Sequence, residues 1–398
     1  MAALRIGIVA GEHSGDNLGA AFMREVLARA PETTFTGIAG PRMRAAGCTV
    51  LADAEELAVM GLFEVLRHLP RLLRLRRRVV EAFLKAPPDV FVGIDAPEFN
   101  LNVAPRLHAA GIPTVQYVSP QVWAWRQGRV KKMARSLDEV LCLLPFETPF
   151  YSGHGLPATF VGHPLADQLP LQPDRAAARA ALGLPAVGPV VAVLPGSRRG
   201  EVERLAPVFA EACSWLRTHL PLVECVAPMA NSATRELFSN AWSAAHAGPV
   251  KLLDGQAQLA MTAADVVLVA SGTATLEATL CKRPMVVAYR LSGATAATFR
   301  LLGLMKAPYF AQPNLLAGES VVPELFQEAA NGPQLGQALL DWFEQPARVA
   351  ALEERFLGIH QQLRRDASAR AAEAVLAVAA RKRGAVPTPG GADAGGAR

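Results

Sequence analysis

Short apolar segments alternate with helical segments along the whole chain, and this alternation constrains the fold more than any other feature. The apolar segments are rich in Val, Ile and Leu, as is typical of strands buried on both faces of a sheet. We expect strands at residues 6–10, 35–39, 90–94, 114–118, 140–144, 159–161, 190–194, 222–226, 250–253, 266–269 and 285–288. Strands that alternate with helices predict parallel sheets covered by helices on both faces, which is an α/β fold.

The chain has 398 residues, too many for one ordinary core. The predicted strands form two complete sets, separated by a polar, proline-bearing stretch from His163 to Pro173. We therefore expect two Rossmann-like domains that face each other across a cleft, with ligands at the carboxyl ends of the strands. The expected segments are an N-terminal domain at 1–165, a C-terminal domain at 166–345, C-terminal helices at 346–380 and a disordered Gly/Pro/Ala-rich tail at 381–398.

Composition argues against several classes of protein. A net charge of +5 is too small to indicate a nucleic-acid-binding protein. The five cysteines form no Cys-x-x-Cys pair, so neither a zinc site nor a disulfide framework is expected. No run reaches the roughly 18 apolar residues of a spanning helix, and the N-terminus becomes polar too soon for a signal peptide. We expect a cytoplasmic protein, either soluble or peripheral to a membrane.

A strand that ends in glycine before a helix indicates a diphosphate site in the second half. The strand expected at 266–269 stops at Ser271 and Gly272, and Thr273 stands where the N-cap of the next helix belongs. The start of a helix directs backbone N–H groups and a positive dipole end at an anion. Glu277, one turn later, is placed to accept hydrogen bonds from ribose hydroxyls. The alternative is an ordinary strand-to-helix turn.

A second turn of the same kind favours the diphosphate interpretation. The strand expected at 190–194 leads into Gly196, Ser197 and Arg198, and a helix is expected from Glu201. Gly196 lets the backbone approach an anion closely, and Arg198 can donate to phosphate oxygens. The spacing matches neither a Walker A loop nor the Gly-x-Gly-x-x-Gly dinucleotide motif.

In the first half, candidate residues follow three of the expected strands. Asp95 stands at the carboxyl tip of a buried strand, where it is either a general base or a helix N-cap. The turn after the first strand supplies weaker candidates, and the turn after residue 118 supplies aromatic and basic side chains that suit sugar rings or acyl chains, or else cover the edge of the core. These candidates for the acceptor or the cleft are Glu12, His13, Ser14, Trp123, Trp125 and Arg126, and Glu98 is a weaker candidate like Glu12 and His13.

Residues 62–78 predict a basic amphipathic helix, with leucines at helical spacing and arginines on another face. The residues concerned are Leu66, Leu69, Leu72 and Leu73, and Arg71 and Arg74. Such a helix suits an anionic membrane surface or acidic lipid headgroups. The alternative is a helix whose leucines pack on the sheet and whose arginines are merely solvated.

Ten motifs occur in an order that resembles a known enzyme family across about residues 4 to 380. They are Gly11-Glu-x-Ser-Gly-Asp16, Ala39-Gly-Pro-Arg-Met43, Glu56-Leu-Ala-Val-Met-Gly61, Gly93-Ile-Asp-Ala-Pro97, Tyr117-Val-Ser-Pro-x-Val-Trp-Ala-Trp-Arg126, Leu144-Pro-Phe-Glu147, Gly162-His-Pro164, Leu194-Pro-Gly-Ser-Arg198, Ala270-Ser-Gly-Thr-Ala274 and Pro313-Asn-Leu-Leu-Ala-Gly318. The chain closely resembles the lipid-A-disaccharide synthases. Two departures are His13, where relatives have a small residue or Thr, and Glu319-Ser320, where an Arg-led pair is familiar.

The resemblance implies an inverting glycosyltransferase of GT-B fold, acting peripherally on the cytoplasmic face of the inner membrane of a Gram-negative cell. It would join UDP-2,3-diacylglucosamine to 2,3-diacylglucosamine 1-phosphate (lipid X), giving a β-1,6-linked lipid A disaccharide 1-phosphate and UDP. No cofactor and no metal are implied, which agrees with the absence of an Asp-x-Asp pair from the sequence. Family function carries over onto Asp95 as base and Arg198 at the leaving UDP, while Asn314 and Glu319 are further candidates at the donor. A homodimer is one open alternative for the oligomeric state.

Two other classes share parts of this pattern. A UDP-N-acetylglucosamine 2-epimerase would use soluble sugars only and would have no use for the basic amphipathic helix at 62–78. A non-catalytic nucleotide-sugar binding protein would need Arg198 but not Asp95. Turnover that depends on a lipid acceptor would separate the glycosyltransferase from both.

Overall fold

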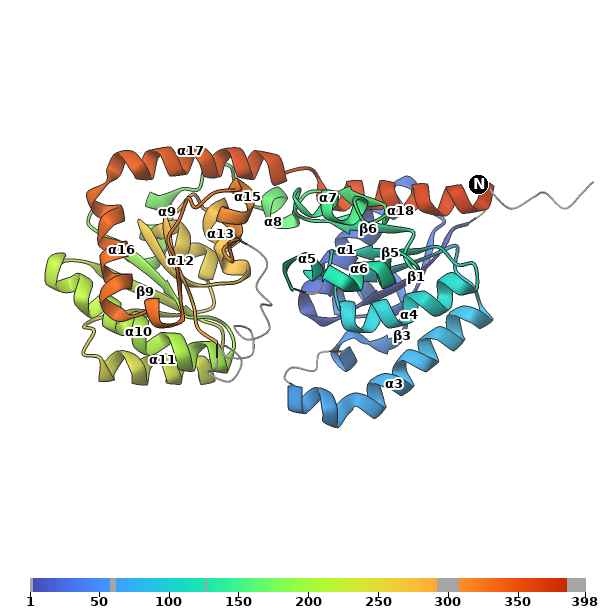
Figure 1. Cartoon of the computed structure of the whole chain (residues 1–398), viewed down its shortest axis with the longest axis horizontal. Coiled ribbons are helices and arrows are strands. Elements are labelled where there is room, and N and C mark those ends of the chain that lie inside the picture. The colour runs from blue at the N-terminus through green and yellow to red at the C-terminus, as the bar shows by residue number, and fades with distance from the viewer. Residues whose placement is uncertain (1–2, 58–61, 126, 292–307, 385–398) are drawn as a thin grey trace, which may run out of the picture. The chain divides into compact units, whose positions relative to one another are not determined.

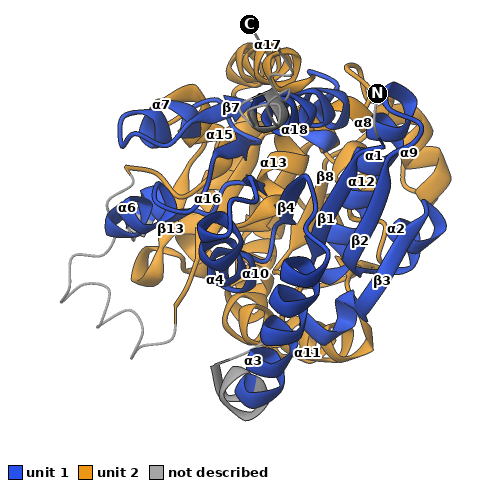
Figure 2. Ribbon diagram, turned by 90° about the vertical axis from the view of Figure 1, so that its right-hand side faces the viewer, with its two compact units in different colours: residues 1–164, 365–398 blue, residues 165–364 orange. Residues whose placement is uncertain are grey.

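The computed structural model describes residues 3–57, 62–125, 127–291 and 308–384 (Figure 1). The chain divides into two compact units, one of residues 1–164 with 365–398 and one of residues 165–364 (Figure 2). The helices expected at 346–380 do not stand apart as a segment of their own. The helix α17 (Pro346–Leu363) belongs to the second unit, and α18 (Ala367–Gly384) belongs to the first.

The first unit contains a seven-stranded sheet in the order β3-β2-β1-β4-β5-β6-β7, with every pair parallel. Its strands are β1 (Arg5–Ala10), β2 (Thr34–Ala39), β3 (Cys48–Asp53), β4 (Val90–Ile94), β5 (Thr114–Tyr117), β6 (Glu139–Cys142) and β7 (Ala158–Phe160). Its helices, besides α18, are α1 (Glu12–Arg29), α2 (Pro41–Ala45), α3 (Leu62–Lys85), α4 (Pro97–Ala109), α5 (Val122–Trp125), α6 (Val130–Met133) and α7 (Glu147–Ser152). The short helix α8 (Pro164–Gln168) begins at the boundary between the units.

The second unit contains a six-stranded sheet in the order β10-β9-β8-β11-β12-β13, again with parallel pairs only. Its strands are β8 (Val190–Leu194), β9 (Glu224–Met229), β10 (Lys251–Asp254), β11 (Val266–Ala270), β12 (Met285–Tyr289) and β13 (Glu324–Phe326). Its helices, besides α17, are α9 (Arg175–Leu182), α10 (Arg199–His219), α11 (Ser232–Ala244), α12 (Ala257–Ala263), α13 (Thr273–Leu280), α15 (Gln312–Ala317) and α16 (Gly332–Glu344). The predicted α/β class with two Rossmann-like sheets is confirmed.

Burial on both faces explains why the central strands are apolar throughout. Every residue of β4, β8 and β11 is buried, so alternation of polar and apolar side chains is absent there. The edge strands β3 and β13 are only partly buried and were missed by the sequence analysis. The helix α18 packs Ala371, Ala372 and Val375 into the same core as Phe22 of α1. It continues beyond Arg381, where a disordered tail was expected to begin, and residues 385–398 lie outside the described part of the chain.

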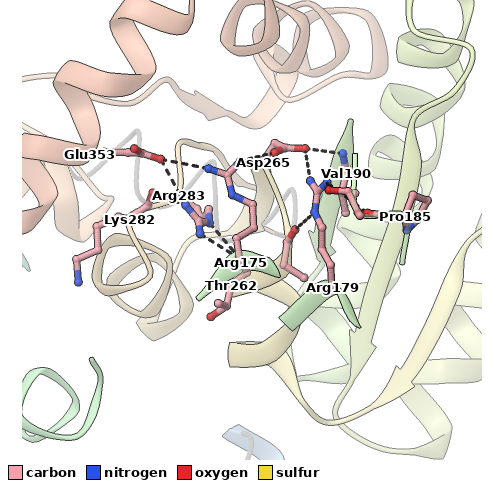
Figure 3. Close-up of polar contacts among 11 residues, drawn as sticks. Arg175, Arg179, Pro185, Val190, Thr262, Asp265, Lys282, Arg283 and Glu353 are labelled. Carbon is pink, nitrogen blue, oxygen red and sulfur yellow. Dashed lines mark hydrogen bonds and ion pairs between the residues drawn. The ribbon is translucent and has the colours of Figure 1, made fainter. Parts of the chain in front are cut away.

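A buried ionic network fixes the amino ends of β8 and β11 in the second unit (Figure 3). Asp265, just before β11, accepts hydrogen bonds from Arg175 Nη1 at 2.7 Å, Arg179 Nη2 at 2.7 Å and the Val190 backbone N–H at 2.8 Å. The Arg179 side chain is 5% exposed and also donates from Nε to the Ala263 carbonyl. Because its partners belong to α9 and β8 while Asp265 itself precedes β11, this network holds α9, β8 and β11 together.

A second buried contact ties the end of α17 to the segment where the second unit begins. Lys282, after α13, donates to the Leu280 carbonyl at 2.6 Å and contacts His360 Nδ1. The other ring nitrogen of His360 donates to the Ala166 carbonyl of α8 at 2.8 Å. Burial lowers the pKa of Lys282 to about 8. The contact therefore holds α8 and α17 against the residues that follow α13.

We expect Asp265→Ala to destabilise the second unit by about 3–5 kcal/mol, because it leaves the Arg179 charge buried without its carboxylate. Thermal and urea unfolding followed by circular dichroism would measure the loss. Glu203→Ala is a suitable control, since Glu203 pairs with Arg199 in an exposed i,i+4 bridge that contributes roughly 0.3–0.5 kcal/mol. Equal effects of the two substitutions would show that the Asp265 network does not stabilise the unit.

Candidate active site

Each sheet has one point at which its strand order reverses, and the predicted site residues gather there. In the first unit the reversal falls between β1 and β4, and in the second between β8 and β11. At such a point the loops leave two neighbouring strands toward opposite faces of the sheet, so a crevice opens beyond the strands' carboxyl ends. Each unit has a cavity at this position.

The cavity of the second unit measures about 340 Å³. Seven of the residues predicted to bind the donor line it: Gly196, Ser197, Arg198, Ser271, Gly272, Thr273 and Glu277. A further wall comes from Pro228, Met229, Ala230, Gly255 and Ala257, at the ends of β9 and β10 and just beyond them. The cavity therefore combines helix N-termini and a guanidinium with an apolar side, which is a combination suited to a phosphorylated ligand with a flat ring.

The turn after β8 is built around Gly196, whose φ of +119° is a conformation that favours glycine. The helix α10 then begins at Arg199, with Arg198 as its N-cap, two residues earlier than predicted. The Glu201 carboxylate accepts from the backbone N–H groups of Ser197 at 3.2 Å and Arg198 at 3.3 Å. The Arg198 guanidinium lies 3.3 Å from the same carboxylate and its side chain is 71% exposed, so it is accessible to a ligand.

The turn after β11 differs from the prediction in its cap. Gly272, with φ +153°, is the N-cap of α13, and Thr273 is the first helical residue. No side chain caps this helix, which leaves its N-terminus directed at the cavity. The Ser271 hydroxyl donates to the Phe310 carbonyl at 3.1 Å. Glu277 lies one turn into α13, and burial raises its pKa.

Asn314 and Glu319 do not line this cavity, contrary to the prediction that they reach the donor. The side-chain amide of Asn314 is fully buried, donates to the Val322 carbonyl and Glu324, and accepts from the N–H groups of Val321 and Val322. It holds the loop after α15 and has no group left for a ligand. Glu319 forms an exposed ion pair with Arg355 of α17 at 2.7 Å.

The cavity of the first unit measures about 540 Å³ and contains Asp95. Glu12 from the start of α1 and Glu98 from α4 line it as well, and three leucines of α3 form its apolar side. Glu98 is engaged by Arg129 in a two-point ion pair of 2.5 and 3.1 Å. The carboxylates of Asp95 and Glu12 therefore dominate the charge at the end of β1 and β4.

Asp95 stands in a strained turn and is not a helix N-cap. Asp95 and Ala96 have φ of +49° and +39°, and Ala96 is the N-cap of α4. Consecutive non-glycine residues in the left-handed region cost about 1–3 kcal/mol each and cluster at functional sites. Glu12 and Val118, at the ends of β1 and β5, also have positive φ. The strain is thus concentrated where three neighbouring strands end.

Two buried amides lock this turn. Asn100 Nδ2 donates to the Asp95 carbonyl at 2.8 Å, and Gln116 Nε2 donates to the same carbonyl at 3.0 Å and to that of Val118 at 3.2 Å. Gly93 is required beside them, because a Cβ there would lie 2.8 Å from the Asn100 side chain. Neither amide was singled out from the sequence, since a lone Asn or Gln in an α/β chain carries no distinctive pattern.

The surroundings of Asp95 make it more basic than an ordinary aspartate. Burial raises the pKa of its carboxyl, the negative charge of Glu12 raises it further, and a hydrogen bond from the Ala96 backbone N–H partly opposes the change. A carboxylate with a raised pKa, facing a cavity, is suited to accept a proton from a hydroxyl.

Comparisons with known proteins agree on one family. The family model for lipid-A-disaccharide synthetase matches residues 6–378. The lipid-A-disaccharide synthase of Xanthomonas euvesicatoria pv. vesicatoria (strain 85-10) is 54% identical over 93% of this chain and 85% of its own length. The chain belongs to the lipid-A-disaccharide synthetase family. The family predicted from the ten motifs, and with it the prediction of a glycosyltransferase, is confirmed.

Solved structures at low identity show that this family member has the GT-B fold. The kitacinnamycin glycotransferase matches with a TM-score of 0.59 at 18% identity, covering 95% of this chain and 100% of that one. The UDP-GlcNAc 2-epimerase from Neisseria meningitidis matches with a TM-score of 0.62 at 13% identity, covering 94% and 100%. Because a glycosyltransferase and an epimerase both match, the fold alone does not separate these two activities.

Several family motifs turn out to hold one another in place. Asp16, in the first motif, accepts from the backbone N–H groups of Gly40, Arg42 and Met43 in the second, at 2.8–3.0 Å. Trp123 donates from Nε1 to the buried Glu147 at 3.2 Å, joining two further motifs. Burial raises the pKa of Glu147 to about 7. These contacts hold α1 against the start of α2, and α5 against the start of α7.

The remaining candidates of the first unit are placed as follows. Glu12 lines the cavity, whereas His13 and Ser14 are exposed in the first turn of α1 and do not. Trp123 does not line it either, because its ring nitrogen is held by Glu147 and its ring packs edge-on against Phe146. The side chain of Trp125 and all of Arg126 lie outside the described residues.

The helix α3 brings part of the predicted leucine face to the Asp95 cavity. Leu69 and Leu73 are each 42% exposed and line the cavity with Leu72, so they are not core residues. The core-facing residues of α3 are Leu75, Val79, Val80 and Phe83.

The two arginines predicted to meet lipid both have partners in the protein. Arg71 pairs with Glu56 at 3.3 Å, and Arg74 donates to the Pro70 carbonyl at 3.3 Å. The side chain of Leu66 is outside the described part, within which no helix is long and apolar enough to cross a membrane.

We expect Asp95→Asn to raise the melting temperature at pH 7. A carboxyl whose pKa is raised by folding destabilises the folded state wherever it is ionised, and asparagine fits the left-handed turn without the charge. The gain should fade as the pH falls toward the ordinary aspartate value of 3.8, since the carboxyl is then increasingly protonated in both states. Melts from pH 4 to pH 8 would measure it. Asp254→Asn, at a carboxylate that is 89% exposed, is the control, and a lower melting temperature for the Asp95 variant at pH 7 would contradict the expectation.

Proposed function

We propose that this protein joins UDP-2,3-diacylglucosamine to the 6-hydroxyl of 2,3-diacylglucosamine 1-phosphate (lipid X), with inversion, giving a β-1,6-linked disaccharide 1-phosphate and UDP. The observation that supports this most is the pairing of two cavities with opposite character. One presents a basic carboxylate in a locked turn, and the other presents a guanidinium and an uncapped helix N-terminus. Membership of the lipid-A-disaccharide synthetase family supplies the class of reaction.

The donor would bind in the cavity of the second unit. The N-terminus of α13 and the Arg198 guanidinium would face its diphosphate, and the uracil ring would lie against the wall at Met229 and Ala257. The two N–H groups of the turn after β8 already donate to Glu201. The charge that develops on departing UDP would therefore be met mainly by Arg198 and the α13 dipole. Glu277 is placed to accept from ribose hydroxyls.

The acceptor would bind in the cavity of the first unit. Asp95 would take the proton of the acceptor's 6-hydroxyl as its oxygen attacks the anomeric carbon of the donor from the face opposite UDP, so one displacement inverts that carbon. The lock by Asn100 and Gln116 would hold the carboxylate in place during this step. The reaction requires that the hydroxyl beside Asp95 reach the sugar of the donor carried by the second unit.

The acyl chains would lie along the leucines of α3. Leu69, Leu72 and Leu73 give the acceptor cavity an apolar side that begins at the protein surface. Two acylated substrates cannot wait in water, so we infer that this helix docks on an anionic membrane surface, with Arg71 and Arg74 near the headgroups. The cytoplasmic face of the inner membrane is the proposed location.

The reaction is tested by incubating the purified protein with lipid X and its UDP derivative, followed by mass spectrometry of the lipid products. Formation of the tetraacyl disaccharide 1-phosphate, dependent on both substrates, is the expected result. Turnover of a UDP-sugar without any lipid acceptor would instead support an epimerase.

We expect Asp95→Asn to lower the rate of disaccharide formation about 10²–10⁴-fold while UDP binding stays near the wild-type value. The amide keeps the shape of the side chain but cannot accept the proton. Arg198→Ala is the matched variant for the other cavity. It should weaken UDP binding roughly 10- to 100-fold through the loss of a charge-assisted contact. Single-turnover rates and calorimetry with UDP separate the two effects, and near-normal turnover of the Asn variant would remove Asp95 from the mechanism.

We expect the double substitution of Leu69 and Leu73 by Ser to reduce co-sedimentation with anionic vesicles at least ~10-fold, because each inserted leucine contributes about 1.5–3 kcal/mol. The melting temperature should change little, since both side chains are 42% exposed. Leu75→Ser is the control: Leu75 is 4% exposed in the core, and its loss should cost about 2–5 kcal/mol. If the melting temperature of the double variant is as low as that of the Leu75 variant, Leu69 and Leu73 are structural residues and the proposal that they dock on a membrane fails.

A further inference from the structure

Arg76 differs from the other arginines described on α3 because it has no partner among the described residues. Arg71 pairs with Glu56, Arg77 pairs with Glu81 at 2.6 Å, Arg74 donates to the Pro70 carbonyl, and Arg78 donates to the Leu51 carbonyl at 2.6 Å. Within the described part of the chain, no hydrogen bond or ion pair holds the Arg76 guanidinium, although the residue is half-buried. A partly buried cation without a partner is costly, which points to a ligand as its partner.

The position of Arg76 along α3 places it inside the acceptor cavity. Leu69, Leu72, Leu73 and Arg76 are spaced i, i+3, i+4 and i+7, so they form one stripe of the helix, and all of them line the cavity that contains Asp95. The stripe is apolar from Leu69 to Leu73 and ends at Arg76, which lies roughly 10 Å along the helix axis from Leu69. A ligand lying along it would meet acyl-binding surface first and a positive charge next.

Arg76 is the only basic residue among the described residues that line this cavity, whose other charged groups are Asp95, Glu12 and Glu98. Glu98 is already paired with Arg129, and neither Asp95 nor Glu12 forms an ion pair with Arg76 in the described structure. A single cation in a concave site attracts an anion more strongly than one in open water. Its planar fork of N–H groups matches the oxygens of a phosphate.

We propose that Arg76 binds the phosphate ester of the acceptor and makes the enzyme specific for a phosphorylated acceptor. This inference rests on the proposed function, in which the acceptor carries a phosphate and its hydroxyl approaches Asp95. The donor diphosphate has its own cationic and dipolar site in the second unit. Arg71 and Arg77, whose side chains are 54% and 76% exposed, are better placed than Arg76 to meet membrane headgroups.

The test compares two acceptors, lipid X and its dephosphorylated counterpart, in neutral detergent micelles with a saturating donor. Arg76→Gln should lower kcat/KM for lipid X about 10- to 100-fold, mainly through KM, and leave the dephosphorylated acceptor unchanged. Arg77→Gln is the matched control, from the adjacent position with an exposed pair to Glu81, and should alter neither acceptor. Arg76→Lys should restore part of the preference, because it keeps the charge but not the fork.

Equal losses for both acceptors, or no loss for either, would overturn the assignment. So would an effect of Arg76→Gln that is confined to co-sedimentation with anionic vesicles, because the partner would then be a lipid headgroup phosphate. A melting curve shows whether the variant folds. If wild-type protein transfers to neither acceptor, the proposed function fails. Calorimetry with soluble glucosamine 1-phosphate and glucosamine then still tests Arg76. Wild-type protein should bind the phosphorylated sugar more tightly than glucosamine, and the Arg76→Gln variant should not.

Discussion

The reversal of strand order in each sheet is the constraint on which both cavities depend. Neighbouring parallel strands normally send their connections to the same face, and the loops pack together. At β1 and β4, and again at β8 and β11, the connections run to opposite faces, and the space between them stays unfilled. Whatever stands in the first residues after those strands then faces a cavity. In this chain those residues include Glu12 and Asp95 in one unit, and Arg198 and Gly272 in the other.

The two units use that space with opposite electrostatics. In the second unit the turns start helices toward the cavity, so backbone dipoles and a guanidinium face it. In the first unit the backbone is forced through left-handed residues at Asp95 and Ala96, and carboxylates face the cavity instead. The strain of about 1–3 kcal/mol per residue persists because two buried amides donate to the Asp95 carbonyl. Relaxing the turn would leave those donors without a partner inside the core, at a further cost of about 1–3 kcal/mol each.

The burial of each strand and side chain explains how much of the fold and the candidate site could be predicted from the sequence. Central strands such as β4 and β11 are apolar at every position and were placed from the sequence, whereas β3 and β13 lie at edges, are half-buried and lack that signal. The glycines expected before two helices, Gly196 and Gly272, both line the cavity of the second unit. Asn314 and Trp123 were selected because they belong to motifs, and a motif shows that a residue matters without showing which way its side chain points. Both side chains form internal hydrogen bonds. Arg76 was missed because five described arginines on α3 look alike in sequence and differ only in their partners.

The chemistry of the proposed substrates explains why an arginine with no ion-pair partner among the described residues matters for recognition of the acceptor. Donor and acceptor carry the same diacylated sugar, so apolar contacts along α3 bind both about equally and cannot tell them apart. What differs is the anion, a nucleoside diphosphate on one and a phosphate monoester on the other. Discrimination between donor and acceptor would then depend on the positions of cations and helix dipoles. A site with an unpaired charge rejects a ligand that lacks the matching group far more strongly than an apolar pocket does. A cavity that held only carboxylates would repel a phosphate. On the proposed assignment, Arg76, which has no partner among the described residues, would reverse that preference at the end of the leucine stripe, where the sugar would stop with its hydroxyl beside Asp95.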